Sequence, residues 1–189
     1  MTDRISGSAF KQMITFGAAC VTQQKQAIND LNVFPVPDGD TGTNMSLTIQ
    51  TAVNELKKSE PATVGEAAKI TAGALLRGAR GNSGVILSLL FRGLSKSVKG
   101  LTDMDGAQLA AAMAEGVTTA YGAVMKPAEG TVLTVSRLAA ARAVEAAQEN
   151  PSAEYVMEQA IAAGYETLAQ TIDMNPVLKK AGVVDAGEI

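Results

Sequence analysis

The chain has 189 residues and a hydrophobic fraction of 47%, which is enough for one domain with a substantial core. Its formal charge of −3 argues against a nucleic-acid-binding surface, because such surfaces are normally basic. It contains no histidine and one cysteine, which excludes histidine-based triads, histidine phosphorelay and an intramolecular disulfide within this chain.

The N-terminal region carries no recognisable targeting signal. Residues 1–7 contain no apolar stretch of the kind found at the centre of a signal peptide. No uncharged apolar run approaches the roughly 20 residues that a membrane span needs. We therefore expect a cytoplasmic protein with no membrane span and no nucleic-acid partner.

Apolar residues recur at helical spacing along the whole chain. The first stripe runs from Phe10 to Leu31 and the second from Met45 to Leu56, and residues 85–94 are apolar nearly all round, which predicts a buried helix. Strand-like alternation is not sustained anywhere, so we predict an all-α fold. The predicted helices cover approximately residues 10–31, 45–58, 64–78, 85–94, 109–120, 132–147 and 157–172.

Three connectors between these helices are rich in glycine and polar residues, at 32–44, 78–84 and 126–131. Two predicted helices separate each connector from the next. If consecutive helices run up and down, each pair returns the chain to the same end of the bundle. The segment 180–185 follows one further pair. We therefore predict that these four segments converge at one end.

The first connector contains Asp38-Gly39-Asp40. The glycine permits a sharp turn that lets both carboxylates face one point, and paired carboxylates suit magnesium that also binds phosphate. An ordinary Asp-Gly turn remains the alternative. An EF-hand calcium loop is disfavoured, because Thr43 stands where that loop needs glycine and Ile49 where it needs glutamate.

Helix starts next to these connectors are candidate anion sites. Thr43 or Asn44 is a suitable N-cap for the helix that is expected near Met45, and Asn82 or Ser83 for the helix that is expected from Val85. Both remain explicable as simple capped turns.

The second connector contains Gly78, Gly81 and Gly84, which let backbone amides approach an anion closely. It lacks the Walker pattern, and it follows a helix rather than a strand, so it is no Rossmann loop. A tight helix-helix connector is the alternative. In the third connector, Thr131 opens a helix and offers a hydroxyl.

Together, the four segments resemble the DhaL-type nucleotide-binding domain. The resemblance rests on residues 35–45, 78–84, 128–131 and 182–185, and it is strongest to the N-terminal domain of bacterial fatty acid kinase ATP-binding subunits. It implies a barrel-like up-and-down bundle of about eight helices, with ATP held in loops at one end. On this basis residues 1–189 form a single domain, excised from or truncated relative to a longer multidomain chain.

The resemblance also implies the roles of particular residues. Asp38 and Asp40 are the catalytic residues and hold magnesium, in a two-ion site that bridges the phosphates, and Asn32 stands where a related family has a third acidic ligand. The residues implied to bind the nucleotide are Thr43, Asn44, Asn82, Ser83, Gly84, Thr131 and Asp185.

The resemblance implies a kinase that phosphorylates the carboxylate of a fatty acid and gives an acyl phosphate. A separate DegV-like carrier protein presents the fatty acid. A homodimer of such a protein would form through regions outside this chain. Two alternatives stay open. One is the nucleotide-binding subunit of a dihydroxyacetone kinase, and the other is a nucleotide-sensing module without catalysis.

Overall fold

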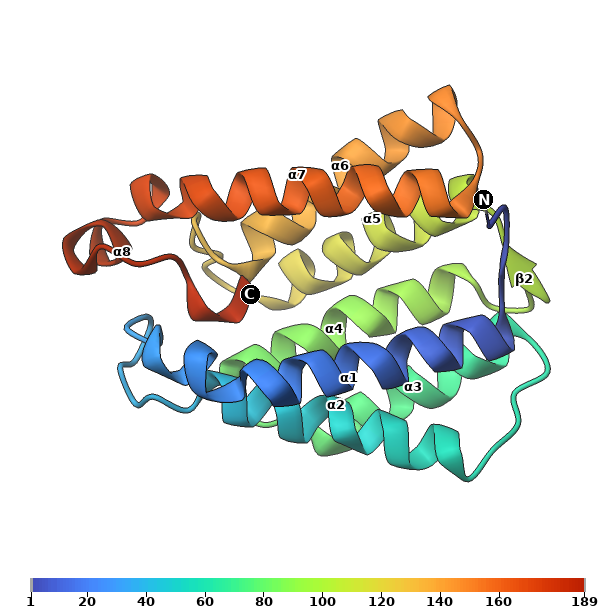
Figure 1. The fold of residues 1–189 in the computed structure, drawn as a ribbon, viewed down its shortest axis with the longest axis horizontal. Helices are drawn as coiled ribbons and strands as arrows, with labels where there is room; N and C mark the ends of the chain where they lie inside the picture. Colours follow the sequence, from blue (N-terminus) through green and yellow to red (C-terminus); the bar gives the residue numbers. More distant parts are fainter. Residues whose placement is uncertain (1, 189) are drawn as a thin grey trace.

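Eight α-helices make up most of residues 2–188, the part of the chain that the computed structural model describes, and this confirms the predicted all-α fold (Figure 1). Two short strands, β1 (Ile5–Ser6) and β2 (Asp103–Met104), pair antiparallel with Ile5 opposite Met104. The helices are α1 (Gly7–Asp30), α2 (Thr41–Lys57), α3 (Val64–Gly78), α4 (Gly81–Ser97), α5 (Gly106–Ala123), α6 (Val132–Glu149), α7 (Ala153–Met174) and α8 (Pro176–Ala181), and a 3-10 turn covers Ala186–Glu188.

Consecutive helices pack side by side, so the chain runs up and down as predicted. Helices α1 to α4 form one half of the bundle and α5 to α8 the other, and the contact between α4 and α5 joins the two halves (Figure 1). The strands β1 and β2 lie at one end of the bundle. The connectors after α1, α3, α5 and α7 lie at the opposite end.

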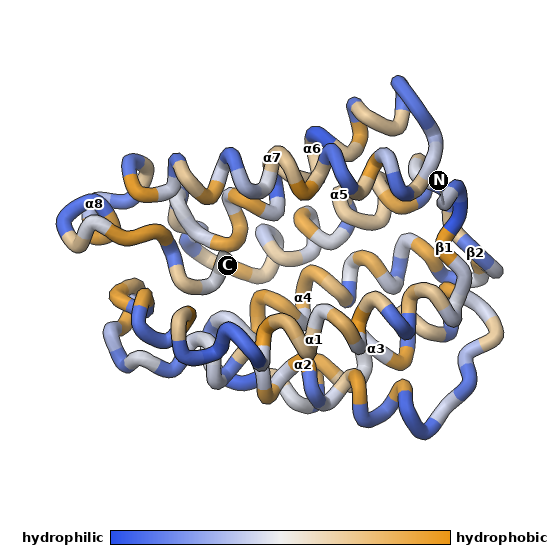
Figure 2. The backbone as a smooth tube through the Cα atoms, in the orientation of Figure 1, coloured by the Kyte–Doolittle hydropathy of each residue, from blue (hydrophilic) through white to orange (hydrophobic). Residues whose placement is uncertain are grey.

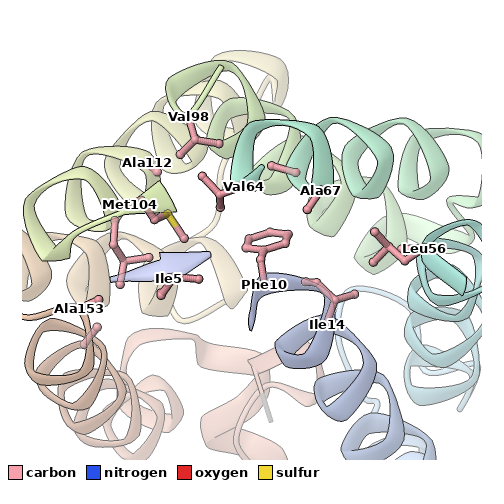
Figure 3. Close-up of a cluster of buried hydrophobic side chains, with 14 of the residues drawn as sticks. Ile5, Phe10, Ile14, Leu56, Val64, Ala67, Val98, Met104, Ala112 and Ala153 are labelled. Carbon is pink, nitrogen blue, oxygen red and sulfur yellow. The ribbon is translucent and has the colours of Figure 1, made fainter. Parts of the chain in front are cut away.

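The core near β1 and β2 consists of apolar side chains from several elements. Figure 3 shows Phe10 of α1 among them, together with Ile5, Val64 and Met104. Val64 and Met104 are fully buried, and much of the remaining core is alanine. Small side chains let the helices approach closely, which suits a chain with only 4% aromatic residues.

Hydropathy along the backbone alternates between apolar and polar faces in most helices, as expected for helices with one face toward a core (Figure 2). None of the helices within residues 2–188 is long and apolar enough to cross a membrane.

The prediction that residues 85–94 form a fully buried helix is wrong. Within α4 the buried residues are Gly84, Ser88 and Gly93, while Val85 is 47% exposed. Leu87, Phe91 and Leu94 are only partly buried, although they pack against the core. Leu90 is one of several that line a cavity of about 290 Å³ between α4, α5 and α6.

Five helices, α1, α2, α4, α5 and α7, begin three or four residues earlier than predicted. Helix α2 starts at Thr41 rather than near Met45, and α4 starts at Gly81 rather than Val85. The polar residues that were expected to cap them therefore lie inside the first turns. Helix α3 has the predicted bounds, Val64–Gly78, because Thr63 and Glu66 form a local capping box at its start.

Candidate functional site

Two adjoining cavities lie where the connectors meet. We call the smaller one, of about 160 Å³, the acidic cavity, and the larger one, of about 320 Å³, the apolar cavity. Together they are lined by residues of all four segments that were predicted to converge, which confirms that prediction. The two cavities share part of their lining, namely Pro35, Thr41, Asn82 and Ser83.

The acidic cavity contains the carboxylates of Asp38 and Asp40. Gly39 between them has φ +66°, a conformation that glycine adopts without strain and that turns the chain sharply. Asp38 is exposed and Asp40 half-buried, and within residues 2–188 neither carboxylate has a hydrogen-bond or ion-pair partner. Two unpaired carboxylates on one small cavity are a suitable oxygen pair for magnesium.

The described residues contain no group of three or more histidine, cysteine, aspartate and glutamate side chains that could hold a metal. A magnesium ion at Asp38 and Asp40 would therefore complete its coordination with water and with oxygens of a bound ligand. This is the usual way in which magnesium binds in sites that handle phosphate. The carboxylates of Asp38 and Asp40 are suitable ligands for such an ion.

Asn32 shapes the loop that carries these aspartates. Its side chain is 6% exposed, and its Oδ1 accepts hydrogen bonds from the backbone N–H groups of Asp40 at 3.1 Å and Thr41 at 3.2 Å. Its Nδ2 donates to the carbonyl oxygen of Val36 at 3.0 Å. Both lone pairs of the oxygen are thus engaged, so the structure gives Asn32 a positioning task.

Thr43 faces α1 rather than the cavities. Its N–H donates to Oδ1 of Asn29 at 3.1 Å, and its Oγ1 accepts from Nδ2 of Asn29 at 3.0 Å. Asn44, in contrast, lines the acidic cavity. It also lies against Gly81, where an added Cβ would come within 2.5 Å of its Nδ2. The Asn29 amide thus anchors the first turn of α2 to α1.

Four helices, α2, α4, α6 and α8, begin at this end of the bundle (Figure 1), and the first turns of α2 and α6 are capped by remote side chains. In α2 the amides of Thr41 and Thr43 donate to Asn32 and Asn29. In α6 the amide of Val132 donates to the carboxylate of Asp185. Such long-range caps satisfy amides that a helix leaves open at its N-terminus.

The first turn of α4 has no such cap among the described residues. Gly81 has φ +61°, and Asn82 and Ser83 at the start of this helix line both cavities. Gly84 faces α2 instead of the cavities. A Cβ added at Gly84 would lie 2.4 Å from Oγ1 of Thr48, so the glycine allows α4 to pack closely against α2. The uncapped helix start beside the acidic cavity carries a positive partial charge, which is suitable for binding an anion.

The apolar cavity is lined mainly by apolar groups from several segments of the chain. Phe34 and Pro35 come from the first connector, Val85 and Ile86 from α4, and Leu133 from α6. Such a lining fits a flat apolar group such as a nucleobase. Its polar residues are few and include Thr131, whose hydroxyl donates to the carbonyl oxygen of Ala128 at 2.8 Å.

Asp185 holds the C-terminal segment at this cavity. It is 7% exposed, and its carboxylate accepts hydrogen bonds from the backbone N–H groups of Val132 and Gly187. Burial raises its pKa from the ordinary 3.8 to about 6, while the two N–H donors act in the opposite direction. Asp185 thus caps α6 and forms part of the cavity wall.

This pKa predicts how stability depends on pH. A carboxyl whose pKa is raised by folding stabilises the fold when protonated, and this contribution is lost as the pH rises through about 6. We expect the wild type to lose roughly 1–2 kcal/mol relative to Asp185→Asn between pH 5 and pH 7.5. Urea unfolding of both proteins at the two pH values measures this difference, and parallel pH dependences would contradict it.

Several residues of the site were not found from the sequence. Asn29 and Thr48 lie inside helices and act across helix contacts, so nothing local distinguishes them. Phe34 and Pro35 lie in the first connector, but the sequence did not indicate that they line a cavity. Thr41 lies within the recognised motif, but its burial could not be read from the sequence.

Comparison with known proteins identifies a matching family model and several related bacterial proteins. The family model described as the DAK2 domain matches residues 35–189. An uncharacterized protein of Staphylococcus haemolyticus (strain JCSC1435) is 46% identical over 187 residues, which is 99% of this chain and 34% of that protein. Uncharacterized proteins of Staphylococcus aureus strains RF122 and USA300 are 45% and 44% identical, with the same coverage. The chain thus spans about a third of the length of these relatives.

Proposed function

Since this chain belongs to the DAK2 domain family, nucleotide-binding modules like the L subunit of dihydroxyacetone kinase, we propose that it binds ATP and magnesium in the two adjoining cavities. We further propose that it is the ATP-binding domain of a cytoplasmic kinase that phosphorylates a fatty acid carboxylate. In this proposal a separate DegV-like carrier protein presents the fatty acid, and the product is an acyl phosphate.

One observation carries the nucleotide assignment. The acidic cavity combines two unpaired carboxylates, Asp38 and Asp40, with the uncapped N-terminus of α4. Carboxylates repel phosphate, whereas helix amides attract it. Both features suit the same ligand when a magnesium ion lies between the carboxylates and the phosphates. The apolar cavity next to it has room for the base.

The proposal distributes roles over the predicted residues. Asp38 and Asp40 hold magnesium, which when bound neutralises charge on the phosphates. The residues proposed to contact nucleotide are Asn44, Asn82, Ser83, Thr131 and Asp185, all of which line a cavity.

Three of the predicted site residues receive positioning roles instead. Asn32 orients the aspartate loop through its bonds to the amides of Asp40 and Thr41, Thr43 ties α2 to α1 through Asn29, and Gly84 seats α4 against α2.

The proposed acceptor fits the chemistry that the chain offers. A fatty acid carboxylate is ionised at neutral pH, so one of its oxygens attacks the γ-phosphorus without a general base. The bond from that phosphorus to the bridging oxygen breaks, and ADP leaves with the electron pair. The absence of histidine from the chain is therefore compatible with this reaction.

The second candidate is the nucleotide-binding subunit of a dihydroxyacetone kinase, which the family match itself favours. Its acceptor is a hydroxyl, which must lose a proton during transfer. Because the chain spans 34% of the length of its Staphylococcus haemolyticus relative, acceptor binding in either proposal depends on parts beyond a domain of residues 1–189.

Phosphoryl transfer by the full-length protein tests the choice between the two acceptors. Radiolabelled ATP is supplied with a fatty acid on its carrier, with free dihydroxyacetone, or with neither. The proposal predicts label only in acyl phosphate. Transfer to dihydroxyacetone alone would replace it with the second candidate, and nucleotide binding without transfer to either acceptor would favour a sensing module.

A further inference from the structure

Arg137 of α6 joins the two ends of the connector between α5 and α6. Its Nε donates a hydrogen bond to the hydroxyl oxygen of Tyr121, in the last turn of α5, at 3.1 Å. Its Nη2 donates to the carboxylate of Glu129 at 2.9 Å. One guanidinium therefore binds a residue on each side of the segment 122–128. We call Tyr121, Glu129 and Arg137 the connector clamp.

A buried hydroxyl strengthens the hold on Glu129. Thr134 is 1% exposed, and its Oγ1 donates to Oε2 of Glu129 at 2.9 Å and accepts from the N–H of Gly130 at 3.0 Å. The same carboxylate oxygen thus accepts from both Thr134 and Arg137. Because both donors lie on α6, they fix the C-terminal end of the connector to that helix.

The connector clamp lines neither cavity, but the segment that it encloses does. Val124, Lys126 and Ala128 form part of the wall of the apolar cavity. Between them, Met125 is 98% exposed and Pro127 is also exposed, so packing does little to hold this stretch in place. Its position depends on the bonds at its two ends.

Global stability is a weak explanation for the connector clamp. The side chains of Arg137 and Glu129 are 43% and 55% exposed, and ion pairs at such exposure add little to the stability of a fold. A short exposed loop, in contrast, opens locally at a small free-energy cost, so weak bonds at its ends decide how well it is ordered. The effect of the clamp therefore falls mainly on the connector.

We propose that Arg137 is a positioning residue, which through the connector clamp holds residues 124–128 as a wall of the apolar cavity and so sets the affinity for the nucleobase. The base as occupant of this cavity rests on the proposed function. The ordering of the connector rests on the bonds of Arg137 alone. Since residues 124–128 do not line the acidic cavity, phosphate binding there should not depend on the clamp.

Two magnesium-bound probes separate these effects. A non-hydrolysable ATP analogue fills both cavities, whereas inorganic tripolyphosphate fills only the acidic one. Arg137→Met keeps the aliphatic part of the side chain and removes both bonds. We expect it to raise the dissociation constant of the ATP analogue about fivefold or more, and to change that of tripolyphosphate by less than about twofold.

The matched control is Arg142→Met. Arg142 lies on the same helix and pairs with Glu149 at 2.7 Å, but it lines neither cavity. Its loss removes a comparable ion pair far from the connector, and we expect it to leave both dissociation constants at their wild-type values. Equal weakening of the ATP analogue in Arg137→Met and Arg142→Met, or equal weakening of both probes in Arg137→Met, would overturn the inference.

Hydrogen exchange in the free protein gives a readout that needs no nucleotide. Arg137→Met is expected to speed the exchange of backbone amides in residues 122–131, while those of α2 and α3 exchange as in the wild type. Unchanged exchange in residues 122–131 would show that Arg137 does not order the connector. Absence of binding of the ATP analogue by the wild type would instead overturn the proposed function, and with it the nucleobase as occupant of the apolar cavity.

Discussion

Asp38→Asn and Asp40→Asn are each expected to weaken magnesium-dependent binding of ATP by about 100-fold or more. Loss of partners that merely support a metal ligand costs 10- to 100-fold in affinity, so loss of a direct carboxylate ligand is expected to cost at least as much. Isothermal titration of the variants with an ATP analogue, with and without magnesium, measures the effect.

The free protein should tolerate these two changes. Neither carboxylate has a hydrogen-bond or ion-pair partner in the described chain, so the stability of the unliganded fold should change by less than about 0.5 kcal/mol. Asp30→Asn is the matched control, because Asp30 is exposed near the same loop, bonds Gln26 and lines neither cavity. Equal losses of binding in the control, or wild-type binding in both site variants, would refute the metal assignment.

Gly93→Ala is expected to cost about 3 kcal/mol of stability, or roughly 6–12 °C in Tm. A Cβ at this position would lie 2.3 Å from the carbonyl oxygen of Glu115 and 2.6 Å from Oγ1 of Thr119. Gly116 makes the reciprocal approach to Leu90 across the same contact, at 2.7 Å. Because backbone atoms on both sides fix the spacing of α4 and α5, a methyl group must separate the two halves of the bundle.

The control is Gly17→Ala on α1, where an added Cβ meets nothing within 4 Å. Alanine is the better helix former, so this variant is expected to gain up to about 1 kcal/mol. Thermal unfolding of the two variants beside the wild type decides the matter. Similar changes in Tm for both substitutions would show that close packing at Gly93 does not limit the α4–α5 contact.

The fold follows from local sequence signals to a large extent. Apolar periodicity predicted the helical class, and counting helices between connectors predicted that residues 32–44, 78–84, 126–131 and 180–185 meet at one end. The predicted start of α3 agrees with the structure, in which Thr63 and Glu66 cap this helix locally. The starts of α2 and α4 were not predicted, because the hydrogen bonds there reach across the fold. Asn32 accepts from the N–H of Thr41, the first residue of α2, and Thr48 accepts from the N–H of Arg80, the residue before α4.

The sequence predicted which residue types form the site, but not which of them face the cavities. A sequence motif marks Asp38 and Asp40 as a pair, while only coordinates show which neighbours face the cavities. Thr43 and Gly84 belong to the same motifs, yet in the structure they form contacts between helices. Thr41 shows the opposite case, since its burial beside both cavities is a property of the packed structure. The short helix α8 after Asn175 was missed because it spans only Pro176–Ala181.

We propose that the acidic and apolar cavities together bind a magnesium-nucleotide complex. Calorimetric titration of the wild-type protein with a non-hydrolysable ATP analogue tests it most directly, first with magnesium and then with EDTA. One-to-one binding that requires magnesium is the predicted result. Binding of equal affinity in EDTA, or no binding in magnesium, would contradict the account.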